Sequence, residues 1–499
     1  MCRTVRMIQN VLNRDRTLWA GIALLYTATR AALLWRFPPH VDESLYATWT
    51  AAGFEHSASR FVALSHGQQP LLEWIGMGFM QVGASPLLAV RLVSFFSGLG
   101  TLALVGVLGR RLGGRSTALV SGALFAILPF FLVYSVIGLY DPLATLFVAA
   151  AVVLLIRVAE RPRLGAALLL GAVLGGGLLT KLTTELSFAL LPFGALFVAW
   201  KHGSRARKLS AWAGSLVVSV AGAWVIYQVL RLSPYYEGLG AARRVFARHS
   251  IGTFLHHPGH WLAANGGSYG WALLGYLTVP MIVAIAVGFV CALKSHRAFA
   301  ILLGVWAALP FVAAVALADI PYVRWLDTGL PALVIFGAYG AVAAFGAIPR
   351  LHLSARLRTV AIVGLAAALF LPALAWDART LAAPLTRRYP GNDDVDYIRG
   401  SSAGGPWLRL VPDLRRLSAG RPLAVAWSGL EVIEYMGLAL RSDPHISLVP
   451  ADSPDAARAL FGFGNGSPLA ASGDGLGWRP IRTYPRPRHG VQVIVYVTA

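Results

Sequence analysis

The chain has 499 residues, of which 57% are hydrophobic and only 13% are charged. Soluble proteins carry about 25% charged residues, so this composition excludes an ordinary soluble domain and indicates a membrane protein. The formal net charge of +21 would suit a nucleic-acid-binding protein, but the basic residues gather in short connections between apolar runs, which argues against that class.

Eleven apolar runs are expected to cross the membrane, and several reach the ~20 residues that a spanning helix needs. The first run follows a basic stretch and has no small-residue cleavage site, so we expect a retained signal anchor. The expected spans cover 17–36, 87–109, 116–137, 141–157, 164–181, 184–200, 210–231, 271–293, 299–318, 323–346 and 357–376.

The basic residues between these spans predict the topology. Nineteen Lys and Arg residues fall in the connections on the N-terminal side of the membrane, and eight fall in the opposite connections. Short cytoplasmic connections carry the excess of Lys and Arg, so the N-terminus is expected in the cytoplasm of a cell whose inner or plasma membrane holds the chain.

The acidic residues are distributed in the opposite way. Residues 1–376 contain eleven acids, and only Asp15 and Glu160 fall on the predicted cytoplasmic side. Selection for positive loops leaves acids unconstrained, so some would fall outside by chance. Their grouping at span ends nevertheless favours a polar cavity that opens outward.

Residues 377–499 are expected outside the membrane, as a small α/β domain that follows a membrane domain of residues 1–376. Short strand-like runs occur at 423–427, 445–449 and 491–497. They alternate with helix-like runs, a pattern typical of α/β domains. The helix-like runs are PWLRLVPDLRRL, GLEVIEYMGLAL and SPDAARALF.

Four polar features converge on the predicted outer face: the pair Asp42–Glu43, the polar segment 65–75, Asp141 and Lys181. The segment 65–75 is too short and polar to span, and is expected to form a helix at the membrane interface. Asp141 could equally be a cap at the start of a helix. Lys181 could equally be a basic anchor at the end of a span.

The order of these motifs resembles the protein O-mannosyltransferase/aminoarabinose transferase superfamily of GT-C class glycosyltransferases. The resemblance covers residues 17–200 well and residues 300–346 loosely. The matching stretches are HVDESLYATWT, QQPLLEWI, AVRLVSFFSGLGTLALVGVLGRRLGG, LFAILPFFLVYSVIGLYDPLATLFVAAAVVLL, GAVLGGGLLTKLT and YVRWLDTGLPALVIFGAYG. It implies a polytopic α-helical GT-C fold and transfer of a hexosyl or pentosyl group from a polyprenyl-phosphate sugar to an extracytoplasmic acceptor.

The resemblance also implies roles for individual residues. Asp42 matches the position of the catalytic acid in the first outer loop, where a carboxylate can take the proton of an acceptor hydroxyl in an inverting displacement. Glu43 and Asp141 are expected to orient the loop or the acceptor. The departing lipid phosphate needs cations or donors, and the candidates are Lys181 and Arg324, with the Tyr322 hydroxyl.

One departure from the superfamily affects donor recognition. Its members often carry a Lys before a proline pair in the first outer loop, whereas this chain reads Gly67-Gln68-Gln69-Pro70. Gln68 and Gln69 can donate hydrogen bonds to the donor phosphate but bring no charge. Arg60 or the basic cluster at 243–248 could supply the missing cation. Arg60, Arg248 and His249 are retained as acceptor or loop candidates.

Two further features leave alternatives open. The histidines of FLHHPGHWLAANGG (254–267) could bind a metal or face the acceptor, but their spacing matches no standard metal site. No metal ligands are therefore assigned, and no cofactor is required, although a divalent metal stays open. Arg91, inside an expected span, could pair with an acid at its outer end or belong to the donor site.

Other classes of membrane protein compete with this interpretation. A transporter or flippase of a lipid-linked sugar would gather its charges near the bilayer midplane, and a scaffold would leave the outer acids unexplained. A glycan ligase or polymerase of another family differs in its donor, a lipid diphosphate glycan. The expected partners are the lipid-phosphate sugar, membrane lipid, and an acceptor glycan, lipid or protein. The sequence does not identify the sugar or the acceptor.

Overall fold

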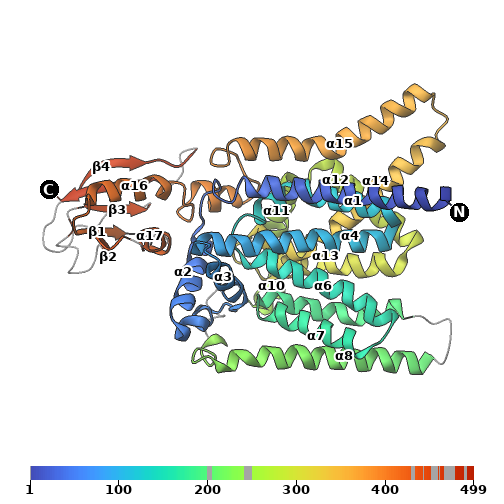
Figure 1. Ribbon diagram of the computed structural model, residues 1–499, viewed down its shortest axis with the longest axis horizontal. Coiled ribbons are helices and arrows are strands. Elements are labelled where there is room, and N and C mark those ends of the chain that lie inside the picture. Colours follow the sequence, from blue (N-terminus) through green and yellow to red (C-terminus); the bar gives the residue numbers. More distant parts are fainter. Residues whose placement is uncertain are drawn as a thin grey trace.

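The computed structural model describes residues 2–198, 205–240, 250–428, 433–441, 443–450, 459, 461–465, 478–487 and 492–498. Figure 1 shows long helices lying side by side along the longest axis, with a small sheet-containing domain at one end. The N-terminus lies at the far end of this helical bundle and the C-terminus lies in the small domain. The two chain ends are therefore separated by the whole bundle.

The bundle is built from apolar helices, because a helix satisfies its own backbone polar groups away from water. Its main helices are α1 Cys2–Ala31, α4 Pro86–Ile127, α5 Pro129–Tyr134, α6 Tyr140–Glu160, α7 Leu164–Leu178, α8 Arg205–Tyr227, α10 Ile251–His256, α11 Pro258–Leu277, α12 Val279–Ser295, α13 Arg297–Leu317, α14 Leu330–Ala347 and α15 Ala355–Ala382. Tighter helices within it are η2 Leu182–Phe197, η3 Gln228–Leu232, η4 Val323–Gly329 and η5 Ile348–Arg350.

Two expected spans, 87–109 and 116–137, share the long helix α4. Its backbone leaves helical geometry at Gly113 and Gly114, and Gly114 has a φ of 75°, which favours glycine. Gly109 lies against Ala118 and Ser121, so close that a Cβ would have no room. The two halves of α4 therefore fold back on each other.

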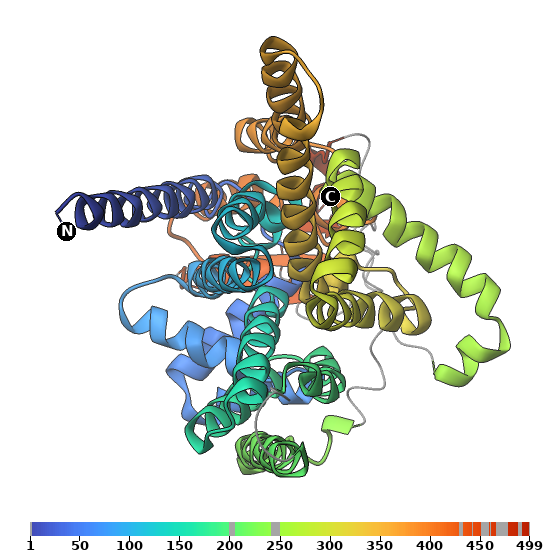
Figure 2. The same cartoon turned by 90° about the vertical axis from the view of Figure 1, so that its right-hand side faces the viewer.

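Among the described residues, six helical segments are long and apolar enough to cross a membrane, or up to seven if the α11–α12 pair, bent by 101°, counts as one. This count is lower than the eleven expected spans. Two of the expected spans share α4, and α1, which holds the first expected span, is not among the segments counted. Two others correspond to the shorter apolar helices α7 and η2. Figure 2, a view from the N-terminal end, shows how the helices surround one another.

Three short elements follow α1 at the end of the bundle that faces the small domain (Figure 1): α2 Val41–Glu55, η1 Ser57–His66 and α3 Leu71–Gln81. The polar segment at 65–75 includes the turn between η1 and α3. These elements carry the polar residues of the first outer loop onto the bundle.

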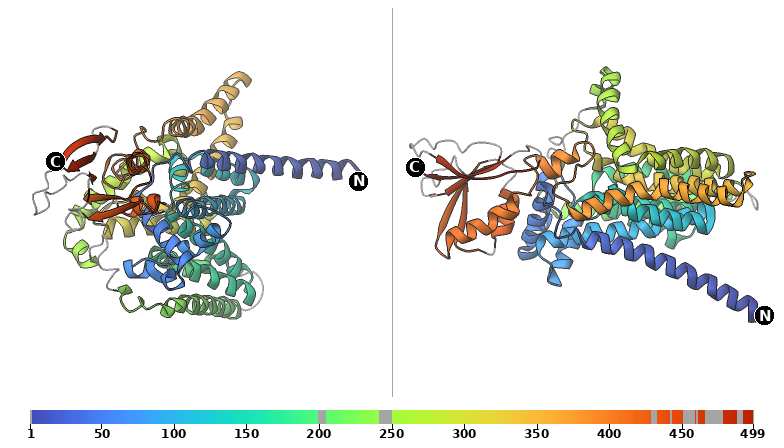
Figure 3. Two further views of the ribbon diagram at one scale, coloured as in Figure 1. Left: turned by 60° about the vertical axis from the view of Figure 1, so that its left-hand side comes forward. Right: turned by 90° about the horizontal axis from the view of Figure 1, so that it is seen from above.

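The C-terminal part begins with residues 383–406, here called the connector, which contain the π-helical turn η6 Val395–Arg399. The domain boundary expected after residue 376 falls inside α15. Beyond the connector the structure describes α16 Trp407–Ser418, β1 Leu423–Ser428, α17 Ile433–Leu440, β2 Ile446–Pro450, β3 Phe461–Asn465, β4 Trp478–Tyr484 and β5 Val493–Thr498. Figure 3 shows this small domain standing beside the end of the bundle.

The five strands form one mixed sheet in the order β2-β1-β3-β5-β4. The strands β2, β1 and β3 pair in parallel, and β5 runs antiparallel to both β3 and β4. The expected strands at 423–427 and 445–449 and the described part of 491–497 are confirmed. So are the first helix-like run and the described part of the second, residues 433–440. The third helix-like run lies mostly outside the described residues.

Candidate active site

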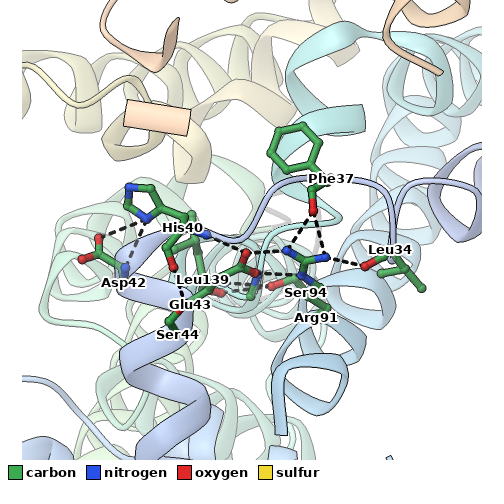
Figure 4. A network of polar contacts seen from close by, with 10 residues as sticks. Leu34, Phe37, His40, Asp42, Glu43, Ser44, Arg91, Ser94 and Leu139 are labelled. Atoms are coloured by element: carbon green, nitrogen blue, oxygen red, sulfur yellow. Dashed lines mark hydrogen bonds and ion pairs between the residues drawn. The ribbon is translucent and has the colours of Figure 1, made fainter. Parts of the chain in front are cut away.

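The adjacent carboxylates of Asp42 and Glu43 lie in opposite environments at the start of α2 (Figure 4). The His40 side chain caps this helix by accepting the Asp42 backbone N–H on Nδ1, at 3.2 Å. Glu43 Oε1 accepts the His40 backbone N–H at 3.0 Å, which completes a capping box. The cap fixes the direction in which each carboxylate points.

Glu43 is fully buried and forms an ion pair with Arg91 of α4, at 2.6 Å from Oε1 to the guanidinium. Its Oε2 also accepts Arg91 Nε at 3.0 Å and the backbone N–H of Gly138 at 2.8 Å. Arg91 donates further to the carbonyl oxygens of Leu34 and Phe37. The pair ties the loop before α2 to α4 and to the segment before α6, which favours a structural role for both side chains.

Asp42 remains 29% exposed and forms an ion pair with Arg324 of η4, at 2.6 Å. Burial tends to raise the pKa of Asp42, but the positive charge of Arg324, with a smaller contribution from Lys181, holds it below its ordinary value. Asp42 is therefore ionised at neutral pH. The Arg324 guanidinium also lies over the Tyr322 ring, 4.6 Å from its centroid.

A second ion pair joins Asp141 to Lys181, with 2.5 Å between Oδ1 and Nζ. Asp141 lies in the first turn of α6, and Lys181 lies between α7 and η2. The charge of Lys181 contributes to the lowered pKa of Asp42, so the two ion pairs lie near each other. Four of the predicted site residues therefore come together at one end of the bundle.

An apolar pocket of about 220 Å³ is lined by the residues that directly follow these two cations, Leu182 after Lys181 and Trp325 after Arg324. Leu182 and Leu186 of η2 line one side, and Pro310 and Leu317 of α13 line another. Trp325, which follows Arg324, completes the wall. A charged site thus borders a small apolar pocket.

The glutamine segment contributes a third polar group. Gln69 and Glu73, near the start of α3, are buried, and within the described residues neither Gln69 Nε2 nor Glu73 Oε2 has a hydrogen-bond partner. Glu73 Oε1 accepts the hydroxyl of Tyr140, the residue before Asp141. Burial raises the pKa of Glu73 to about 8, so this carboxyl is protonated at neutral pH.

The connector forms a wall of the site that the sequence did not predict. The Tyr397 ring packs against the His40 ring, with centroids 4.8 Å apart. The backbone N–H of Val41 donates to Ser402 at 3.1 Å, and that of Gly404 donates to Pro39 at 2.8 Å. The loop that carries Asp42 is therefore clamped by the chain that leads into the small domain.

Asp393 anchors the connector to the bundle. Its Oδ2 accepts the hydroxyls of Tyr134 at 2.7 Å and Tyr276 at 2.5 Å. A signal was available in the sequence, since the run NDDVDY at 392–397 concentrates acids and a tyrosine shortly after the expected end of the membrane domain at residue 376. His40 also lay within the motif already singled out for Asp42.

The remaining predicted residues lie elsewhere or stay open. Gln68 is half-buried in the turn before α3, and Arg60 is exposed on η1, where its carbonyl accepts the Trp74 ring N–H at 2.7 Å. Arg248 and His249 lie outside the described residues. The exposed histidines at 256, 257 and 260 belong to α10, α11 and the turn between them, and no group of metal-ligating side chains is placed to hold an ion within the described ranges.

Comparisons with known proteins agree with this architecture. Residues 65–232 match the family model of dolichyl-phosphate-mannose-protein mannosyltransferase. ArnT from Cupriavidus metallidurans, solved with bound undecaprenyl phosphate, is similar with a TM-score of 0.57 and 14% identity, over 96% of this chain and 97% of that one. No curated protein matches the sequence.

The oligosaccharyltransferase of Archaeoglobus fulgidus, in its apo form, is a second similar structure. It has a TM-score of 0.58 and 11% identity, over 91% of this chain and 69% of that one. Together these findings establish the fold and confirm the resemblance that the sequence motifs indicated.

Proposed function

On the premise that the chain is a GT-C class protein of the protein mannosyltransferase/ArnT superfamily, we propose that it transfers a sugar from a polyprenyl-phosphate donor. The acceptor is a hydroxyl group on the outer side of the membrane. The observation that carries the proposal is Asp42, an ionised and partly exposed carboxylate beside two cations, Arg324 and Lys181.

The chemistry requires a base and a stabilised leaving group. The acceptor oxygen attacks the anomeric carbon, and the bond from that carbon to the phosphate oxygen breaks. The hydroxyl proton passes to the Asp42 carboxylate, and the bonding electrons leave with the lipid phosphate. This is one inverting displacement without a covalent enzyme intermediate, and Asp42 acts as general base.

Arg324 and Lys181 are the proposed ligands of the donor phosphate. Each is held in place by a carboxylate, Asp42 or Asp141, so a phosphate would compete with that carboxylate for the cation. If Arg324 turns toward the phosphate, Asp42 is released to meet the acceptor. Donor binding would thereby prepare the base for acceptor attack.

Neutral donors would supplement the cations. The buried Gln69 amide has an N–H group without a hydrogen-bond partner among the described residues, and Gln68 and Tyr322 lie in segments that approach the same end of the bundle. The neighbouring apolar pocket of about 220 Å³ suits the first isoprene units of the lipid. The donor would thus place its phosphate at the cations and its chain against η2 and α13.

Asp141 is proposed to orient Lys181, and Glu43 to fix the loop that carries Asp42. The Glu43 carboxylate already binds Arg91 and accepts two backbone N–H groups, so it is unsuited to accept a proton. Glu43 is therefore proposed as a positioning residue.

The proposed topology places the N-terminus in the cytoplasm and the small domain outside. The excess of basic residues in the N-terminal set of connections supports it, and so does the position of the two chain ends at opposite ends of the bundle. A reporter that is active only outside the cytoplasm, fused after residue 499, should be active.

Purified protein incubated with a panel of polyprenyl-phosphate sugars tests the activity. The expected result is release of free polyprenyl phosphate together with a glycosylated acceptor, or slow hydrolysis when water replaces the acceptor. Movement of intact lipid-linked sugar between leaflets, with no bond cleaved, would instead indicate a flippase.

A further inference from the structure

A cavity of about 790 Å³ lies at the end of the bundle away from the small domain, where α6 ends and α7 begins. Figure 2 looks at this end of the bundle. The cavity is lined by arginines and by apolar side chains, and it lies far along the bundle from the ion pairs of the candidate active site. Its function therefore does not depend on the function proposed above.

The cavity carries an uncompensated positive charge. Arg111 is neutralised by Glu160, whose two carboxylate oxygens each lie 2.9 Å from Arg111 Nη1. Within the described part of the chain, the other three arginines of the cavity, Arg157, Arg161 and Arg163, form no ion pair. The three guanidinium groups are exposed, so water and salt screen much of their mutual repulsion, and an anion bound between them would neutralise the rest.

The local backbone adds to this preference for an anion. Arg163 is the N-cap of α7, and its side chain makes no capping hydrogen bond there. A cation at this position faces the positive end of the helix dipole, which is unfavourable, whereas a phosphate group would accept the free N–H groups of the first turn.

The apolar part of the wall indicates that the anion belongs to a lipid. Leu154 of α6 and Ala166 and Leu169 of α7 line the cavity beside the arginines. Leu164, Leu168 and Leu169 are more than half exposed, so the outer face of α7 next to the cavity is open to acyl chains. Arginines that merely reach toward water at a span end would need neither a shared cavity nor this apolar wall.

We propose that this cavity binds the phosphate headgroup of an anionic phospholipid. The guanidinium groups of Arg157, Arg161 and Arg163 would hold the phosphate oxygens through charge-assisted hydrogen bonds. The acyl chains would lie along α7. Basic pockets between membrane helices are well suited to such headgroups.

Native mass spectrometry of the purified full-length protein tests the site, with phosphatidylglycerol and phosphatidylcholine as probes. The wild type should bind phosphatidylglycerol at least about tenfold more tightly than phosphatidylcholine, because only the former has a net negative charge. Inorganic phosphate in excess should not displace it. Equal affinity for the two lipids, or displacement by inorganic phosphate alone, would overturn the proposal of a lipid site.

Two matched triple variants separate this cavity from the general positive charge of that end of the bundle. Arg157→Gln/Arg161→Gln/Arg163→Gln should lose about tenfold in affinity for phosphatidylglycerol. The control Arg350→Gln/Arg356→Gln/Arg358→Gln removes the same charge from exposed positions in η5 and the first turn of α15, and should leave the affinity within about twofold. Equal losses in both variants would contradict a defined site.

A test on the wild type keeps the proposal falsifiable if the cavity variant does not fold. A phosphatidylglycerol with a photoreactive headgroup should label residues 154–169 after irradiation. Labelling that is confined to other segments would rule the cavity out.

Discussion

The ring of Tyr397 packs against the ring of His40, with centroids 4.8 Å apart, although 357 positions separate the two in the sequence. His40 in turn accepts the backbone N–H of Asp42. Burial lowers the pKa of His40 to about 4, so the ring is neutral at physiological pH and serves as a cap and not as a charge. The connector thus positions the proposed base through one intermediate side chain.

This relationship predicts a graded response at position 397. Tyr397→Ala removes the ring contact and should lower kcat about threefold to tenfold, since an aromatic pair contributes roughly 0.5–1.5 kcal/mol. Tyr397→Phe keeps the ring and should restore most of the rate. Steady-state kinetics with saturating donor measures both. The substitution should change kcat more than it changes KM for the acceptor. An unchanged kcat in Tyr397→Ala would show that the connector does not contribute to the site.

The donor site predicts a different kinetic pattern for Lys181. Lys181→Gln removes a charge-assisted contact to the donor phosphate and should weaken donor use by about 1.5–3 kcal/mol, or roughly tenfold to a hundredfold in kcat/KM. Lys294→Gln, a control at the exposed end of α12, should leave donor use unchanged. If Lys181→Gln altered only the acceptor dependence, Lys181 would belong to the acceptor side of the site.

The buried pair of Glu43 and Arg91 predicts a loss of stability. Arg91→Met leaves the Glu43 carboxylate buried without its partner, which should cost about 3–5 kcal/mol of unfolding free energy. Glu43→Gln should also lower the thermal midpoint of unfolding. The fraction of the variant that stays folded should nevertheless retain most of the wild-type kcat. Thermal unfolding in detergent, with kinetics on the folded fraction, separates the two effects. A stable Glu43→Gln variant without activity would show that Glu43 takes part in the chemistry.

Glu73 predicts a dependence of stability on pH. Its pKa is raised to about 8 in the folded protein, whereas a glutamate in the unfolded chain has a pKa of about 4.3. Between these values the folded state keeps a proton that the unfolded state has lost, so the contribution of this residue to stability falls as pH rises from about 4.3 to about 8. Below that window the contribution is fully present.

Glu73→Gln tests this dependence because it cannot ionise and its carbonyl oxygen can still accept the Tyr140 hydroxyl. The variant should lose less stability than the wild type between pH 5 and 8, as thermal midpoints across this range would show. Glu55→Gln, at an exposed carboxylate of α2 that pairs with Arg441, serves as control because an exposed ion pair contributes little to stability. Parallel curves for wild type and Glu73→Gln would mean that Glu73 is ionised in the folded protein.

The sequence predicted the features that depend on local patterns. Apolar runs located most of the membrane helices, and strand-like runs located β1, β2 and β5. The eleven expected spans exceed the six or seven segments counted among the described residues. Two of the expected spans are the halves of α4, which fold back on each other at Gly113 and Gly114, and two others are the short helices α7 and η2. Helix length depends on packing as well as on composition.

The candidate site residues Asp42, Asp141, Lys181 and Arg324 came from polar groups on the predicted outer face and from the resemblance to the superfamily. The structure joins them in two ion pairs, and their roles stay proposals. Sequence reasoning could not tell Asp42 from Glu43 by environment, since the difference comes from Arg91 on another helix. Tyr397 and Asp393 were missed because their contacts to His40, Tyr134 and Tyr276 join distant segments.

Turnover of purified Asp42→Asn tests the central claim most directly, with Glu55→Gln as the carboxylate control on the same helix. Asparagine keeps the shape and can still contact Arg324, but it cannot accept a proton, so kcat should fall by roughly 10²–10⁴-fold with little change in donor affinity. Glu55→Gln should match the wild type. Near wild-type turnover in Asp42→Asn, alongside an inactive Asp141→Asn, would contradict the account and move the base to the other ion pair.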